Sequence, residues 1–360
     1  MKSREEINQD GGTTWTLVIL AIVLLIIFAA YEFLYSQLVC PPICSDENLT
    51  KADFRSKSMD GSNFSNSSLK GADFTGASLN NSNFSGADLS GATFKKASLV
   101  EADFTGAQMI GTDFSEANLT ASKVDFADLT SANFINAILT GVKFSDSVIL
   151  TAVNFTNAVL IHTDFTGADL NGAKLSGAKL LGAKLNRSTL DGADLSRANL
   201  DGSLLSGARL LGATLDYASL HGANLEFTDL SGVSFDRTDL NGANLAKANL
   251  TGADFTVTQL GGADLTESTL RNAIFSGARV SGANLFETTQ LNTQYTIYVN
   301  QNFPPFTILL PTNLDGANMT GAKLYGSSLE GATLAGADFY DVQYDESTLW
   351  PPDFNPQEIE

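Results

Sequence analysis

Gly71 to Phe94 reads GADFTGASLNNSNFSGADLSGATF, and a large apolar residue returns in it every five positions. An α-helix repeats about every 3.6 residues and a β-strand about every two, so neither element accounts for this spacing. A small residue stands two places before each large one, and a polar residue usually stands directly before it. Two positions in five therefore suit a protein interior. A chain that turns a corner every five residues satisfies the pattern and winds into a solenoid.

The alternation of Phe with Leu or Met indicates how many sides each coil has. From Phe54 to Phe114, Phe recurs every ten residues and Leu or Met fills the positions midway. A four-sided coil of twenty residues stacks like side chains on like, whereas three sides would mix them in every column. We therefore predict four sides and three sets of stacked core rings: Phe54, Phe74, Phe94, Phe114 and Phe134; Phe64, Phe84 and Phe104 on the opposite face; and Phe235, Phe255 and Phe275.

The A-[DN]-[LF]-x-x pattern resembles the pentapeptide-repeat proteins, and the resemblance extends from Leu49 to Leu349. It implies an all-β solenoid, namely a right-handed quadrilateral β-helix. Counting the large apolar residues gives about 56 repeats or about 14 coils, and at ~4.8 Å per coil the rod is ~65 Å long. We expect the β-helix at residues 49–285, its final coils at 312–349, and a C-terminal cap or tail at 350–360.

Two interruptions break the five-residue register. Six residues separate Ile149 from Phe155, so we expect one extra residue between Leu150 and Val153, as a local bulge. The second interruption is the longer segment 286–311.

Segment 286–311 is expected to be an inserted loop or hairpin. YTIYV and FTILL are β-rich runs, and NQNFPP between them supplies turn residues. Functional contacts concentrate in such insertions of repeat folds, and its aromatic residues suit a contact with a partner protein. The alternative is a hairpin that folds back over one face of the coils. The predicted contact residues are Tyr295, Tyr298, Phe303 and Phe306.

One long apolar segment lies near the N-terminus. Trp15 to Ala30 reads WTLVILAIVLLIIFAA without a charge, and about 20 such residues cross a bilayer core. After a polar tail at 1–12 we therefore predict a single transmembrane α-helix at 13–35 that anchors the chain in the lipid bilayer. A cleaved signal peptide is the alternative, although FAAYEF is a poor cleavage site.

The sequence gives weaker signals for the side of the membrane on which the repeats lie than for the membrane segment itself. Lys and Arg on the two sides of the apolar segment nearly balance, so the positive-inside rule leaves orientation open. In the linker 36–48, Cys40 and Cys44 flank two prolines and can form a disulfide in an oxidising compartment, although two inert thiols are the alternative. We expect a bacterial plasma or thylakoid-type membrane, with the repeats on the extracytoplasmic or lumenal side.

The charge balance and the chemical residues of the sequence restrict the classes of partner and function. Asp and Glu number 40 against 21 Lys and Arg, giving a net charge of −19, which argues against a nucleic-acid partner. His162 and His221 fall on outward positions about three coils apart, and no nucleophile, base or metal set converges in the sequence. We therefore expect no catalytic, cofactor or metal site.

The resulting expectation is a non-enzymatic, membrane-anchored scaffold that presents an acidic rod to an unidentified protein partner, such as a membrane complex. The family resemblance implies an alternative, because some pentapeptide-repeat proteins mimic DNA and bind a DNA-processing enzyme such as gyrase. It also implies that a homodimer can form through the C-terminal coil.

Overall fold

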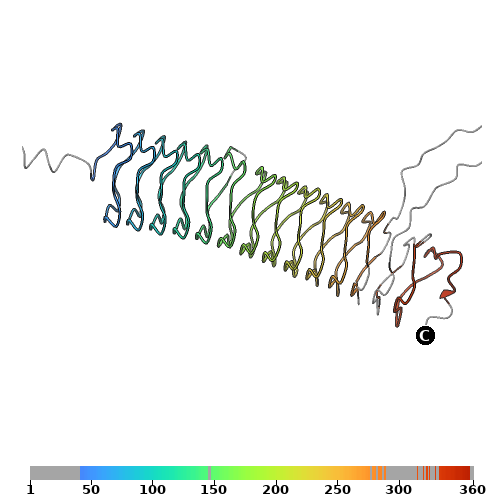
Figure 1. Cartoon of the computed structure of the whole chain (residues 1–360). Coiled ribbons are helices and arrows are strands. Elements are labelled where there is room, and N and C mark those ends of the chain that lie inside the picture. The colour runs from blue at the N-terminus through green and yellow to red at the C-terminus, as the bar shows by residue number, and fades with distance from the viewer. Residues whose placement is uncertain are drawn as a thin grey trace, which may run out of the picture.

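The computed structural model describes residues 41–144, 147–275 and 332–356, together with 278–280, 283–285 and the single positions 288, 314, 319, 322, 324 and 329. Residues 41–144 and 147–275 form a rod of stacked coils, which runs from the blue to the orange ribbon in Figure 1. Neither an α-helix nor a strand longer than one bridge residue occurs among the described residues. None of them forms a helix long and apolar enough to span a membrane.

Parallel bridges between single residues join each coil to the next. The bridges link residues 20 positions apart, as in Asp53 with Asp73 and Ser58 with Ser78, except for four bridges around the extra residue, which link residues 21 apart. The four sides predicted from the Phe and Leu alternation are therefore confirmed. We number the faces by the core residues Phe54 (face 1), Met59 (face 2), Phe64 (face 3) and Leu69 (face 4), and we name a corner by the two faces that it joins.

Hydrogen bonds between coils run along the rod. Asp73 N donates to the Ala52 carbonyl of the preceding coil at 2.9 Å, and Phe74 N donates to the Thr93 carbonyl of the next coil at 2.8 Å. Within a coil, Ala77 N donates to the Phe74 carbonyl at 2.9 Å and closes the corner. Each side of the coil is thereby held to both neighbours, which satisfies the buried backbone groups.

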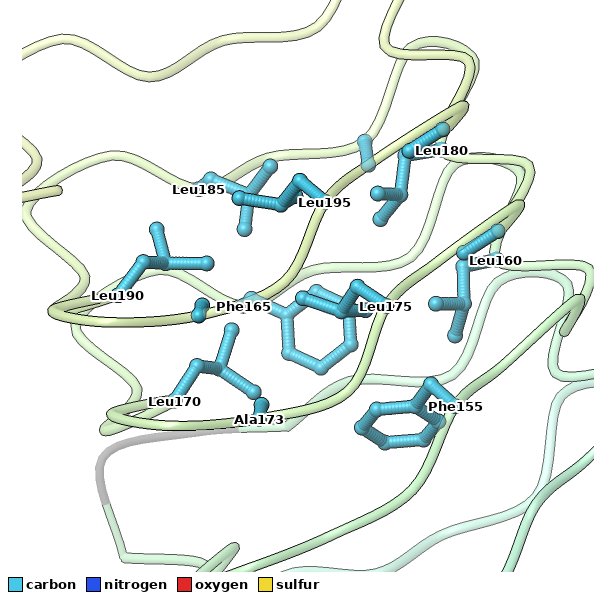
Figure 2. Close-up of a cluster of buried hydrophobic side chains, with 14 of the residues drawn as sticks. Phe155, Leu160, Phe165, Leu170, Ala173, Leu175, Leu180, Leu185, Leu190 and Leu195 are labelled. Carbon is cyan, nitrogen blue, oxygen red and sulfur yellow. The ribbon is translucent and has the colours of Figure 1, made fainter. Parts of the chain in front are cut away.

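Stacked side chains fill the interior. Phe74 lies 4.6 Å from Phe94, centroid to centroid and nearly parallel, while Phe84 meets Phe74 edge to face at 5.8 Å. Both geometries are favourable for aromatic pairs. Further along, Leu replaces Phe in the same columns, and Figure 2 shows Leu175 after Phe155 with both side chains directed into the core. The rings assigned to columns in the sequence analysis stack in the structure from Phe54 to Phe134, from Phe64 to Phe104 and from Phe235 to Phe275.

The extra residue lies before Leu150, so its predicted position between Leu150 and Val153 is wrong. Lys123 bridges Lys143 at a separation of 20, but Asp128 bridges Ile149 at 21. The chain therefore gains one residue between Lys143 and Ile149. Ile149 is 49% exposed while Leu150 is buried. Because both residues are apolar, the sequence pattern did not show which of them faces inward.

A second register shift occurs at the C-terminal end. Leu349, counted above as a core residue, is 50% exposed, and Trp350 turns toward the core instead. Trp350 stacks on Phe354 at 5.0 Å and meets Phe339 edge to face at 5.7 Å. The Tyr344 hydroxyl donates to the Pro356 carbonyl at 3.0 Å. These contacts place residues 350–356 against the last coil.

At the other end, Cys44 is buried and disulfide-bonded. The sequence contains only one other cysteine, Cys40, which lies outside the described residues. The predicted membrane segment 13–35 also lies outside them.

Candidate interaction surface

Most Asp and Asn side chains of the repeat cap a corner of their own coil. The residue directly before a core residue accepts a hydrogen bond from the backbone N–H two positions later. Asp73 Oδ1 accepts from Thr75 N at 2.9 Å, and Asn83 Oδ1 accepts from Ser85 N at 2.9 Å. This Asx turn supplies an acceptor that the corner otherwise lacks. Since Asn serves as well as Asp, the fold requires the oxygen atom but not the charge.

Other carboxylates connect neighbouring coils. Asp60 Oδ1 accepts from Ser78 Oγ at 2.7 Å and from Asn80 N at 2.8 Å. The Ser78 hydroxyl and then the Asn80 amide stabilise the ionised form, so the pKa of Asp60 lies below its usual value. Such aspartates are part of the fold, and their charge alone does not define a binding site.

On face 1, an arginine compensates two aspartates that face each other across a bridge between coils. Asp53 bridges Asp73, and Arg55 lies between them, 2.7 Å from Asp53 Oδ2 and 3.7 Å from Asp73 Oδ2. The hydrogen bond from Arg55 holds the pKa of Asp53 well below its usual range. All three side chains are more than a third exposed, so this cluster contributes little to stability.

Large side chains occupy several left-handed corner positions that glycine fills elsewhere. On the 1/2 corner, Tyr217 has φ 59° and lies between Arg197 and Arg237, whose guanidinium carbons are 5.6 and 5.3 Å from its ring centroid. On the diagonally opposite 3/4 corner, Lys247 lies 5.1 Å from the Phe227 ring centroid. Cation–π contacts of this kind offset the exposure of the rings.

Phe126 on the 3/4 corner differs from these. Its side chain is 71% exposed, more than any other large apolar side chain among the described residues. Its φ is 60°, and within the described part of the chain no ring or cation lies over it. The sequence analysis missed Phe126. The available signal was a bulky residue at a position where this repeat places Gly or Asn.

The remaining candidate residues do not assemble into a chemical site. His162 and His221 both lie on the 2/3 corner, about three coils apart, and the described residues contain no group of three His, Cys, Asp or Glu side chains placed to hold a metal ion. Lys174, Lys179 and Lys184 lie on faces 1, 2 and 3. The predicted contact residues Tyr295, Tyr298, Phe303 and Phe306 lie outside the described residues.

The family profile of pentapeptide repeats matches eight segments of the chain, at residues 48–86, 82–120, 125–146, 154–192, 193–226, 218–256, 258–288 and 312–345. These segments cover most of the sequence and coincide with the stacked coils. The chain belongs to the pentapeptide-repeat family. The coils are those of its right-handed quadrilateral β-helix.

Solved pentapeptide-repeat structures resemble this member. HetL from the cyanobacterium Nostoc sp., a protein involved in heterocyst differentiation regulation, is 30% identical over 68% of this chain and 92% of its own, with a TM-score of 0.28. An Arabidopsis thaliana pentapeptide-repeat protein of the thylakoid lumen is 26% identical over 35% of this chain and 69% of its own, with a TM-score of 0.24. Full-length QnrB1, a plasmid-mediated fluoroquinolone resistance protein, is 15% identical over 82% and 92%, with a TM-score of 0.20. No curated protein sequence matches.

Proposed function

We propose that this pentapeptide-repeat protein is a membrane-anchored scaffold that presents its rod to a protein partner outside the cytoplasm. The observation that carries the proposal is the filled core. Inward positions are occupied by packed Phe, Leu and Ala side chains along the described rod, whereas small-molecule sites are concave. Binding therefore has to use the outer faces, the corners or segment 286–311.

The apolar segment at 13–35 and the disulfide at Cys44 support the membrane and compartment parts of the proposal. Nineteen or more consecutive residues of this character suit a bilayer span. A disulfide persists in oxidising compartments and is rare in the cytosol. Together they favour a rod on the extracytoplasmic or lumenal side.

Membrane topology tests the compartment. A C-terminal tag is exposed to protease in intact cells or spheroplasts, with a cytoplasmic protein as control. We expect cleavage of the tag while the control stays intact. Protection of the tag until lysis would contradict the proposed side, and the gyrase-mimic alternative would then merit a direct binding assay.

The aromatic residues of segment 286–311 are the proposed contact for the partner. Tyr298→Ala combined with Phe306→Ala should abolish co-purification of the partner, while the circular dichroism spectrum and melting temperature of the rod stay unchanged. Loss of the melting transition would instead indicate that the segment covers the coils. Retained co-purification would exclude both side chains as the contact.

A further inference from the structure

The first coils divide their charges unevenly between the sides of the rod. Residues 43–97 contain six Lys or Arg and six Asp or Glu, so they are neutral in a chain with a net charge of −19. All six cations fall in residues 50–57, 70–77 and 90–97, which form face 1 with its flanking corners and which we name the basic face. The exposed cations are Lys51, Arg55, Lys57, Lys70, Lys95 and Lys96.

The basic face contains few carboxylates of its own. Only Asp53 and Asp73 lie within it, so six cations stand against two carboxylates and the net charge is +4. Both aspartates contact the same Arg55. Lys51 and Lys57 have no carboxylate oxygen within 4.0 Å among the described residues.

Two carboxylates just outside the basic face pair with it as well. Asp88 on face 4 lies 2.9 Å from Lys70, and Glu116 of the next coil lies 3.7 Å from Lys95. With these two counted, six cations still exceed four carboxylates. The three other acids of residues 43–97 lie on different sides of the rod: Asp46, Glu47 and Asp60.

The positive charge ends after the third coil. On face 1 and its corners, the next coil adds Asp113 and Glu116, and no Lys or Arg follows on this side until Lys174. Asp194 and Asp254 lie further along the same face. The basic face is therefore confined to the end of the rod from which the chain continues toward segment 13–35.

A short connection holds this end close to the proposed membrane segment. Six residue steps lead from position 35 to Pro41, where the described rod begins, and a fully extended chain of that length spans about 22 Å at most. The three turns of the basic face add about 10 Å along the rod axis. A bilayer is thus the surface that the chain itself keeps beside these cations, at a high effective concentration.

We propose that the basic face docks on anionic lipid headgroups of the bilayer in which segment 13–35 is anchored, and so turns face 1 of the first coils toward the membrane. Clusters of about four to eight Lys and Arg beside a membrane segment are attracted to such headgroups. The proposal rests on the proposed anchor, but it does not depend on which side of the membrane carries the rod.

The charge reversal along face 1 determines how far the contact extends. From the fourth coil on, carboxylates such as Asp113 and Asp194 would be repelled by anionic headgroups. The rod therefore contacts the surface only at its first coils and leaves it at an angle. The later coils stay accessible to a protein partner.

Energy transfer from the full chain in vesicles tests the orientation. A fluorophore is attached at Thr75→Cys, on the 1/2 corner, or at Ser85→Cys, on the diagonally opposite 3/4 corner of the same coil. In phosphatidylcholine with phosphatidylglycerol, transfer to a headgroup-labelled lipid should be at least about two-fold stronger from position 75. The two positions should become equal in phosphatidylcholine alone, and also in about 1 M NaCl, where the Debye length falls to about 3 Å.

Charge reversal on the basic face should remove the difference. Lys51→Glu combined with Lys96→Glu changes two left-handed corner positions of the kind that Glu116 occupies with a φ of 60°, so the melting temperature should not fall. The matched control is Arg187→Glu combined with Lys247→Glu, at the same position of later 3/4 corners. This control should retain the two-fold ratio.

Flotation of the vesicles in alkaline carbonate, which strips peripheral proteins, reports the anchor separately. Every variant should float. If the wild type failed to float, the anchor would be refuted and this proposal with it. Flotation with equal energy transfer from positions 75 and 85 would refute only the docking of the basic face.

Two further results would overturn the proposal. A ratio that persists in phosphatidylcholine alone would assign the orientation to the linker instead of the charges. Sedimentation in detergent that shows self-association of the chain, lost in Lys51→Glu with Lys96→Glu, would assign the basic face to the acidic coils of a second copy.

Discussion

The second corner residue of each repeat carries most of the backbone cost of this fold. Its φ is positive throughout the described rod, and Gly or Asn often occupies it, as in Gly252 (φ 68°) and Asn66 (φ 56°). Where it is occupied by Val257, with φ 57°, the branched Cβ crowds the backbone. A bulky or branched residue at this corner position therefore lowers the stability of the rod relative to Gly or Asn.

Exchange at this position should change stability in both directions. Val257→Gly is expected to raise the free energy of unfolding by about 1 kcal/mol, since glycine accepts the left-handed conformation. Gly252→Val should lower it by a similar amount, although an added Cβ at Gly252 meets no atom within 4 Å. Guanidinium unfolding followed by circular dichroism measures both. Equal effects of the same sign would show that the backbone conformation is not the cause.

Core rings should respond differently from exposed ones. Phe94 is fully buried between Phe74 and Phe114, so Phe94→Ala is expected to lower the free energy of unfolding by about 3–5 kcal/mol. Phe126→Ala is the control, and a change within about 0.5 kcal/mol is expected there because the side chain is exposed. The denaturant midpoints of the two variants measure the difference. Equal midpoints would contradict the assignment of Phe94 to the core and of Phe126 to the surface.

At the level of the structural elements, some corners are stabilised by a carboxylate that accepts hydrogen bonds from the next coil. Protonation of that carboxylate should weaken them. The pKa of Asp60 lies below the ordinary 3.8, so its ionised form stabilises the folded state. That contribution is complete above pH 3.8 and is lost as the pH falls through the lower folded-state value.

The consequence is a pH-dependent mutant effect. Asp60→Ala should melt at a lower temperature than the wild type at pH 7, because Ser78 Oγ and Asn80 N lose their acceptor. The difference should narrow below pH 3.8. Thermal unfolding between pH 2 and pH 7 tests this, and a difference that is constant with pH would exclude the carboxylate as its source.

The C-terminal tail is the second element with a specific role. Trp350 and Phe354 pack on Phe339 and cover the end of the last coil, where an open end would offer unpaired backbone groups. Replacing both Trp350 and Phe354 by Ala should therefore increase self-association. Light scattering on a sizing column would detect it. An unchanged mass would argue that the tail does not protect the end, and homodimerisation through this coil stays a separate prediction.

For the whole molecule, periodicity made the four sides and the stacked columns predictable, because residues twenty apart have to share a column. The position of the extra residue was not predictable, since Val148, Ile149 and Leu150 are all apolar and only the bridge pattern shows that Ile149 faces outward. The exposure of Phe126 was also missed, because a repeat pattern describes what positions share. Residues that differ from the repeat pattern, such as Phe126, can be recognised only when equivalent positions of successive coils are compared.

The direction of the inter-coil hydrogen bonds determines how the rod bears load. Donors such as Phe74 N and their acceptors lie along the long axis, so tension applied between the two ends would pull these bonds lengthwise and separate coils one after another. Force applied across the rod would act on many coils together and meet the interlocked core. A tether that held the protein sideways could thus resist a pull that would unravel it end to end.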